Sequence, residues 1–409
     1  MNKKKESKVV PNVRFKGFTD DWKQRKFDDV GSVAMCKRIF KEQTSDEGEV
    51  PFYKIGTFGR EPDAFISREL FNEYKTKYPY PNKGDILISA SGSIGRTVEF
   101  TGRDEYFQDS NIVWLKHGNE IDNSFLKVLY SVIEWSCEGS TIKRLYNDNF
   151  LKTEFMLPKI DEQIKIGNYF SNLDNLITLH QQKLTLLTKL KKAMLEKMFP
   201  KKGSVIPEIR FNGFANAWEQ RKVLDLLIQP ITDGPHETPK LVEEGVPFIS
   251  VDAIVDNKID FNRKRGNISE EYDELCCKKY KPQFHDVYLV KSGSTVGKVA
   301  IVETTDRFNI WSPLAAMRCG EKSYPYFLYN LLQTKDLQAQ VADKSSNGTQ
   351  PNLSMRELEK FPVSVPSNLE EQKKIGDYFR NLDHLITLHQ RKIDKLKNLK
   401  KAMLDQIFI

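Results

Sequence analysis

The chain has 409 residues, which is too long for one ordinary hydrophobic core. Its 63 Lys and Arg against 56 Asp and Glu give a formal net charge of +7, which is compatible with a polyanionic partner but does not identify one. The five cysteines are odd in number and include no C-x-x-C pair, so we expect neither a disulfide framework nor a zinc knuckle, and a reducing, cytoplasmic location. No apolar run approaches the roughly 18 residues of a membrane span, and the basic start MNKKKESK lacks the hydrophobic stretch of a signal peptide.

A short motif occurs near the start of each half of the chain. PNVRFKGFTDDWKQRK begins at Pro11 and PEIRFNGFANAWEQRK begins at Pro207, an offset of 196 residues. The segments that these motifs open, 11–158 and 207–366, otherwise barely resemble each other, and each predicts a globular α+β domain. Strand-like runs cover residues 85–91, 112–115, 287–292 and 299–302, and helical stretches cover 122–136 and 324–341.

Each domain is followed by a segment that the chain repeats. Residues 162–199 and 371–408 align without a gap at an offset of 209, and 25 of the 38 positions are identical. Apolar residues recur in steps of three and four without a proline, which predicts a helix of about 57 Å with a narrow apolar seam. The seam residues are Leu173, Ile177, His180, Leu184 and Leu187 in the first copy, and Leu382, Ile386, His389, Ile393 and Leu396 in the second.

So narrow a seam on so long a helix needs a partner, and the economical partner is the other copy. We expect antiparallel pairing, in which His180 and His389 meet near a local twofold axis if the copies overlap fully. That pair would either fix the register or act as a pH switch, because histidine titrates near neutrality. The chain then divides into a frayed basic tail (1–10), a first domain (11–158), a central helix (159–200), a linker (201–206), a second domain (207–366) and a C-terminal helix (367–409).

One turn-rich element is common to both domains. SGSIGR (91–96) and SGSTVGK (292–298) each follow a strand-like run and combine glycines, hydroxyls and one cation. Such a turn can offer free backbone N–H groups and a positive charge to a phosphate. It can equally be a connection that needs glycine only for its φ angles.

Two divergent domains that alternate with two near-identical helices resemble the specificity subunit of type I restriction-modification enzymes, over essentially the whole chain. The shared turn and the starts of the helices also carry the resemblance. Each helix start follows a proline: Pro158 precedes Glu162, Gln163 and Ile166, and Pro366 precedes Glu371, Gln372 and Ile375. The first helix lacks the tandem four-residue repeat that some members of the family use to lengthen it.

The resemblance implies two target-recognition domains in a pseudo-twofold arrangement, separated by two long antiparallel coiled-coil helices. Each domain would read one half of an asymmetric, bipartite site in double-stranded DNA, and the helices would set the spacer and dock the modification (methyltransferase) subunits, two per specificity subunit. Restriction (endonuclease) subunits would join through the complex, and a membrane would not be a partner. The chain itself would be non-catalytic and bind no cofactor, because S-adenosylmethionine, Mg²⁺ and ATP belong to the partner subunits.

For such a protein, affinity comes from Lys and Arg that neutralise phosphates, and specificity comes from side chains that reach base edges. Arginine suits guanine, and amide side chains suit adenine. The candidate DNA contacts are Ser91, Ser93, Arg96, Lys143, Arg144 and Asn147 in the first domain, and Ser292, Ser294, Lys298, Thr349, Gln350 and Asn352 in the second.

The motifs that would indicate other functions are weaker. Asp63, Glu73 and Lys75 fit the loose PD…ExK nuclease pattern, but abundant charged residues produce this pattern by chance, and the second half has no counterpart. His236 beside Glu237 lacks a second ligand at helical or hairpin spacing, so a loop histidine is the better interpretation than a metal site. A coiled-coil scaffold for proteins and a single-chain nuclease or methyltransferase are the alternatives to a DNA reader.

Overall fold

The computed structural model describes residues 10–139, 143–346 and 351–408, and the chain divides into two compact units. Unit 1 comprises Met1–His180 and Arg391–Ile409, and unit 2 comprises Gln181–Gln390. Each unit therefore combines one of the two expected domains with one end of each repeated helix. Among the described helices, none has the length and apolar character needed to cross a membrane.

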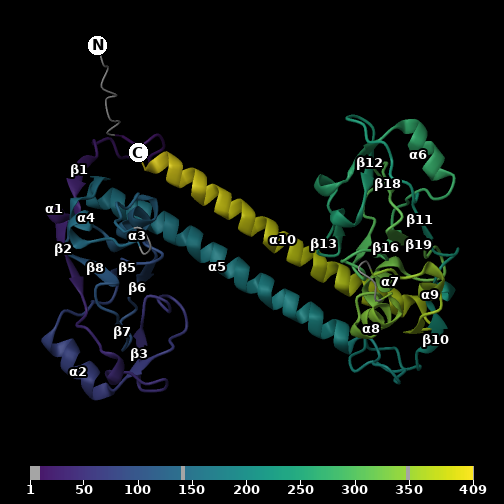
Figure 1. Cartoon of the computed structure of the whole chain (residues 1–409), viewed down its shortest axis with the longest axis horizontal. Coiled ribbons are helices and arrows are strands. Elements are labelled where there is room, and N and C mark those ends of the chain that lie inside the picture. The colour runs from purple at the N-terminus through teal and green to yellow at the C-terminus, as the bar shows by residue number, and fades with distance from the viewer. Residues whose placement is uncertain (1–9, 140–142, 347–350, 409) are drawn as a thin grey trace, which may run out of the picture. The chain divides into compact units, whose positions relative to one another are not determined.

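Unit 1 is built on two sheets and a β-ribbon (Figure 1). The larger sheet has the order β2-β8-β5-β6 and is antiparallel, and it is buried on both faces. Ile86 and Ile88 pack in the core formed with the helices, whereas Leu87 between them packs toward the smaller sheet, β4-β3-β7. The bounds are β1 Lys23–Lys26, β2 Gly31–Met35, β3 Val50–Tyr53, β4 Phe65–Ile66, β5 Ile86–Ser89, β6 Thr97–Glu99, β7 Tyr106–Phe107, β8 Ile112–His117, β9 Glu154–Leu157, α1 Phe27–Val30, α2 Arg68–Lys77, α3 Asn123–Val132 and α4 Asn147–Lys152.

Unit 2 repeats this plan with different side chains. Its larger sheet has the order β11-β19-β16-β17, its smaller sheet the order β15-β12-β18, and β10 pairs with β20 as β1 pairs with β9. A hairpin, β13-β14, is added. The bounds are β10 Glu219–Lys222, β11 Thr232–Asp233, β12 Val246–Ile249, β13 Ile254–Val255, β14 Lys258–Ile259, β15 Gly266–Ile268, β16 Val287–Val290, β17 Val299–Ile301, β18 Asn309–Ile310, β19 Leu314–Met317, β20 Pro362–Val365, α6 Glu270–Cys277, α7 Pro325–Leu331, α8 Lys335–Lys344 and α9 Met355–Glu359.

The four expected strands are confirmed as β5, β8, β16 and β17, and helices form in both expected helical stretches. The stretch 122–136 is helical only as far as Val132, because Ile133 has an extended backbone, and Trp135 then stacks on Phe150 at 5.2 Å between ring centroids. The stretch 324–341 is helical in two parts, α7 and α8. The helices are separate because the Thr334 hydroxyl accepts a hydrogen bond from the Leu337 N–H and caps α8.

The repeated segments form the two long helices that were expected. α5 spans Ile160–Lys197 and α10 spans Leu369–Ile407. Within each unit, the last turns of one helix pack antiparallel on the first turns of the other. In unit 1, Lys400 binds the carboxylate of Asp174 at 2.6 and 2.8 Å, and in unit 2 Lys191 binds Asp383 at 2.7 and 2.9 Å. If the two copies overlapped fully, a different residue would lie opposite each aspartate. The lysine that binds the aspartate lies four residues, about one turn, beyond that residue.

The expected seam is buried most deeply at four positions, Leu173, Ile177, Leu382 and Ile393. Leu187 packs against the core of unit 2, and Leu396 packs against the core of unit 1. The contact between His180 and His389 would join the two units, and it stays a prediction. The seam residues that are half-buried are His180, Leu184, Leu187, Ile386, His389 and Leu396.

The short motif that opens each half of the chain meets the start of a long helix. In unit 1, Glu162 is 1% exposed and accepts two hydrogen bonds from the Arg14 guanidinium, at 2.7 and 2.8 Å, and one from the Trp22 indole at 3.2 Å. The bond to Glu162 raises the pKa of the Arg14 guanidinium. In unit 2, Glu371 is bound in the same way by Arg210 and Trp218.

The glutamine that follows each of these glutamates binds backbone groups of its own domain. Gln163 donates to the carbonyl oxygens of Glu120 and Pro158, and its side-chain oxygen accepts the Asp122 N–H at 2.8 Å, directly before α3. The helix start is thereby tied to the start of α3. Gln372 makes the equivalent bonds to Pro366 and Tyr324 in unit 2.

The single glycine near the start of each long helix allows a close approach of another helix. A Cβ atom at Gly167 would lie 1.9 Å from Ser124 Oγ and 2.7 Å from the backbone nitrogen of Phe125, in the first turn of α3. A Cβ atom at Gly376 would meet Tyr324 and the backbone of Phe327 in the same way.

We therefore expect Gly167→Ala to lower the free energy of unfolding by about 1–3 kcal/mol, because backbone atoms of α3 would have to move. This loss opposes the gain of up to about 1 kcal/mol that alanine brings to a helix interior. Urea unfolding of the full chain measures the difference. Asn168→Ala, at an exposed position of the same turn, is the control and should not destabilise the protein. Equal midpoints for both variants would contradict the close-packing role.

Candidate nucleic-acid interface

In unit 1, the predicted DNA-contacting residues lie at one end of the larger sheet. The turn 91–96 connects β5 to β6, and the backbones of Gly92 (φ 66°) and Gly95 (φ 87°) adopt the left-handed conformation that glycine allows. The segment 143–145 runs beside it, since Leu145 N–H donates to the Ala90 carbonyl at 2.8 Å and Gly92 N–H donates to that of Lys143 at 3.3 Å. The structure thus brings two separate candidate segments together.

Unit 2 builds the same framework from different side chains. Gly293 N–H donates to the Pro351 carbonyl at 3.0 Å, and Leu353 N–H donates to that of Lys291 at 2.7 Å. Ser292 pairs with Asn352 in an isolated bridge, as Ser91 pairs with Arg144. The turn 292–298 is one residue longer than its counterpart, so its glycine and cation stand at Gly297 and Lys298.

The candidate side chains differ in how freely they could reach a ligand. Ser91 is buried, and its hydroxyl donates to Asn111 Oδ1 at 2.7 Å. The guanidinium of Arg96 donates to the Ile55 carbonyl at 2.6 Å and lies over the Phe58 ring, so this cation positions a neighbouring loop. Ser292 is half-buried, Thr349 and Gln350 lie outside the described residues, and the exposed candidates are Ser93, Lys143, Arg144, Asn147, Ser294, Lys298 and Asn352.

The sequence analysis missed cations that the larger sheet brings to the same end. Lys37 and Arg38 lie two and three residues after the end of β2 and are exposed, and β2 pairs with β8 next to Asn111. Arg38 lies 3.9 Å from Asp109, and the Arg144 guanidinium donates to Asn111 Oδ1 at 3.4 Å. Two consecutive cations close behind a strand were the signal that could have identified Lys37 and Arg38. We call the exposed loops at this end of unit 1 (36–38, 91–96, 109–111 and 143–147) loop cluster 1.

The equivalent loops of unit 2 (233–238, 292–298, 311–313 and 351–354), here called loop cluster 2, contain a buried carboxylate. Asp233 is fully buried, and Lys291 and His236 approach it at 3.3 and 3.2 Å, together with Lys279. His236 therefore faces a carboxylate and two lysines, which supports a loop histidine over a metal ligand. Strand register places Met35 of unit 1 at the position of Asp233, so this charged group is particular to unit 2.

The residues of the nuclease-like pattern do not form a common site. Asp63 pairs with Lys54 at 2.9 Å, and Lys75 pairs with Asp104 at 3.3 Å. Glu73 pairs with Lys77, one turn along α2. The two carboxylates and the lysine of the pattern are thus directed to three separate partners.

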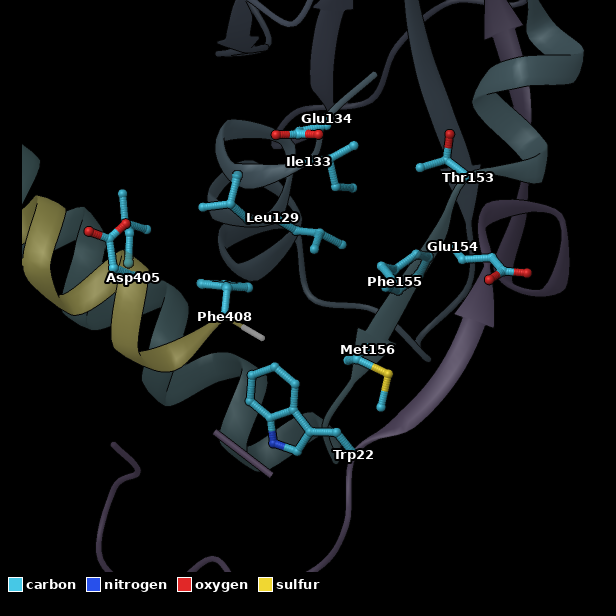
Figure 2. Close-up of a pocket in the computed structure, with 12 residues that line it drawn as sticks. Trp22, Leu129, Ile133, Glu134, Thr153, Glu154, Phe155, Met156, Asp405 and Phe408 are labelled. Carbon is cyan, nitrogen blue, oxygen red and sulfur yellow. The ribbon is translucent and has the colours of Figure 1, made fainter. Parts of the chain in front are cut away.

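A hollow in unit 1 is unsuited to DNA. It has a volume of about 430 Å³ and lies between α3, β9 and the end of α10, with Trp22 and Phe408 among its apolar lining residues (Figure 2). Glu134, Glu154 and Asp405 also line it, so negative charges surround it and would repel phosphates. Loop cluster 1, where cations and amides are exposed, is the better candidate for a polyanion.

Comparisons with known proteins identify the family of the chain. The family model described as the type I restriction modification DNA specificity domain matches twice, over residues 19–189 and 218–398. A Haemophilus influenzae protein described as a type I restriction enzyme specificity subunit is 56% identical over 155 residues, which cover 37% of this chain and 40% of that protein. The MjaVIII specificity subunit of Methanocaldococcus jannaschii is 25% identical over 79% of this chain and 78% of its own length.

Among solved structures, the S subunit of the type I restriction-modification system from M. genitalium has the same fold. The similarity extends over 98% of this chain and 99% of that one, with a TM-score of 0.66 and 16% sequence identity. The alignment to the Haemophilus protein, by contrast, spans less than half of that protein's length.

Proposed function

The chain belongs to the family of type I restriction modification DNA specificity domains, and we propose that it is the DNA-recognition subunit of such a system, with each unit reading one half of a bipartite site. One observation carries the proposal. Equivalent backbone hydrogen bonds hold the loop clusters of both units, yet the side chains on them differ: Arg144 in unit 1 corresponds to Asn352 in unit 2. A fixed framework with different side chains is what two readers of different sequences require.

The partners of the chain would be modification subunits, and restriction subunits would join through them. Leucines are exposed at equivalent positions of both long helices, which supports two copies of one partner subunit. In unit 1 they are Leu176, Leu179 and Leu399, and in unit 2 they are Leu385, Leu388 and Leu190. The chain would not catalyse a reaction, and S-adenosylmethionine, Mg²⁺ and ATP would be bound by the partner subunits.

The salt dependence of DNA binding tests this function. We expect the affinity of the assembled complex for duplex DNA to fall steeply between 50 and 200 mM salt, by about 10³-fold if some six phosphates are contacted. Replacing both Lys143 and Arg144 by alanine should make the slope of log K against log salt shallower by up to about 0.9 for each phosphate contact that is lost. Binding measured by fluorescence anisotropy over a salt series gives both slopes.

Lys77→Ala is the matched control, because Lys77 is an exposed cation of unit 1 that pairs with Glu73 on α2, outside loop cluster 1. This variant should keep the wild-type slope. A response to salt that is flat for the wild type would contradict DNA recognition and would favour a scaffold for proteins.

A further inference from the structure

An arginine lies over the ring of a tryptophan that belongs to loop cluster 2. The guanidinium carbon of Arg265 lies 4.1 Å from the centroid of the Trp311 ring. Two hydrogen bonds position the tryptophan. Trp311 Nε1–H donates to the Glu237 carbonyl at 3.1 Å, and the Trp311 backbone N–H donates to the Ile249 carbonyl at 2.9 Å. Arg265 is exposed and makes no ion pair with any residue that the structure describes, so its N–H groups are available to a ligand.

This pair adjoins the loops already assigned to the interface. Ser312, next to Trp311, donates its backbone N–H to the Pro235 carbonyl at 3.1 Å, and the Pro313 carbonyl accepts the Lys291 N–H at 2.8 Å. Arg265 thus lies on one continuous surface with the turn that starts at Ser292. Arg263 and Lys264, which precede Arg265 in the chain, are also exposed, and Lys279 pairs with Asp233 of loop cluster 2.

Unit 1 has different chemistry at the two equivalent positions. The register of β3 with β4 and of β12 with β15 places Asp63 where Arg265 stands. Gln108 takes the place of Trp311, because its backbone N–H donates to the Tyr53 carbonyl as that of Trp311 donates to the Ile249 carbonyl. The side-chain oxygen of Gln108 is occupied by the Ile55 N–H at 2.8 Å. Between these two equivalent positions, an arginine lies over an aromatic ring in unit 2 and not in unit 1.

We propose that Arg265 is a specificity-determining residue of unit 2, which recognises a guanine in the half-site that this unit reads; the inference rests on the DNA-recognition function above. Stacking on an aromatic ring fixes the plane of a guanidinium and leaves its edge free for two parallel hydrogen bonds. The O6 and N7 acceptors of guanine in the major groove match that edge. Lys264, as a flexible point charge, suits a phosphate instead.

The test uses the complete complex of this chain with its modification subunits. The sites methylated by the wild type are first mapped by sequencing, and competition binding then measures affinity for duplexes in which each base pair of the unit 2 half-site is substituted in turn. For Arg265→Ala and Arg265→Lys we expect discrimination at one G·C pair to fall about tenfold to a hundredfold, with the other half-site read as before. The lysine variant should not restore discrimination at this base pair, because lysine cannot make the two parallel hydrogen bonds.

Arg263→Ala is the control, since Arg263 is exposed two residues away. It should weaken binding to all duplexes alike and make the salt slope shallower. If Arg265→Ala behaved like Arg263→Ala, with every base preference intact, Arg265 would be a phosphate contact and the inference would be wrong. A variant that loses recognition of both half-sites would also contradict it. Absence of any methylated bipartite site with the wild-type complex would instead refute the proposed function itself.

Discussion

Replacing residues 207–366 with the corresponding segment of another family member is expected to change one half of the recognised site completely and leave the other half intact. All of loop cluster 2 lies within this segment, and all of loop cluster 1 lies within residues 11–158. Since specific binding exceeds non-specific binding by about 10³-fold or more, methylation of the original site should fall to background. Sequencing of methylated sites in a host that carries the chimera and its partners measures the change.

The structure indicates which donor segments can be used. The donor must keep arginine and tryptophan at the positions of Arg210 and Trp218, because both bind Glu371, which lies outside the exchanged segment. It must also present a helix start that packs as closely on Gly376 as α7 does. The reciprocal chimera, with residues 11–158 exchanged, is the control and should change only the other half-site. A chimera that folds but changes both half-sites would disprove the assignment of one half-site to each unit.

The second large effect is expected on stability. Arg14→Ala should lower the free energy of unfolding by about 3–5 kcal/mol, because it leaves the carboxylate of Glu162 buried without its counterion. Glu162 is 1% exposed, and the two hydrogen bonds from Arg14 offset the cost of removing its charge from water. Urea unfolding followed by tryptophan fluorescence measures the loss, since the indole of Trp22 binds the same carboxylate.

Two further variants separate the buried pair from general charge effects. Arg14→Lys keeps the charge but cannot make the bidentate contact, so we expect an intermediate loss. Lys159→Ala removes an ion pair with Asp20 that is largely exposed, and it should leave the unfolding midpoint close to that of the wild type. Equal midpoints for Arg14→Ala and Lys159→Ala would mean that the contact with Glu162 does not stabilise the fold.

The repeated residues were visible in the sequence, but their roles were not. Arg14 and Glu162 are 148 residues apart, so nothing in the pattern around either one indicates that they meet. Gly167 is the single glycine of the first repeated segment, yet only the backbone of α3 beside it explains why a glycine stands there. The helical stretch over 324–341 divides into two helices for a local reason, because Thr334 caps the start of the second one.

For similar reasons, the sequence predicted only part of the candidate site. Ser91 and Arg144 were named separately, and the structure pairs them in one bridge. Arg38 and Arg265 were not named, because neither lies in a motif that the two domains share, and only the pairing of β2 and β15 with other strands places them beside the candidate loops. Arg96 fitted the motif but faces the protein, where Ile55 and Phe58 hold it.

The sequence by itself determined the division into two α+β domains, the two long helices and the family to which the chain belongs. Short-range periodicity and the repeat at an offset of 209 residues indicate these features. Both patterns can be recognised without knowing how the chain folds. Only the tertiary structure decided which distant residues meet: the buried clamps on Glu162 and Glu371, the cations around Asp233, and the arginine stacked on Trp311. Such contacts depend on the packing of each whole unit, because it is the pairing of sheets and helices that brings residues together across more than a hundred positions of sequence.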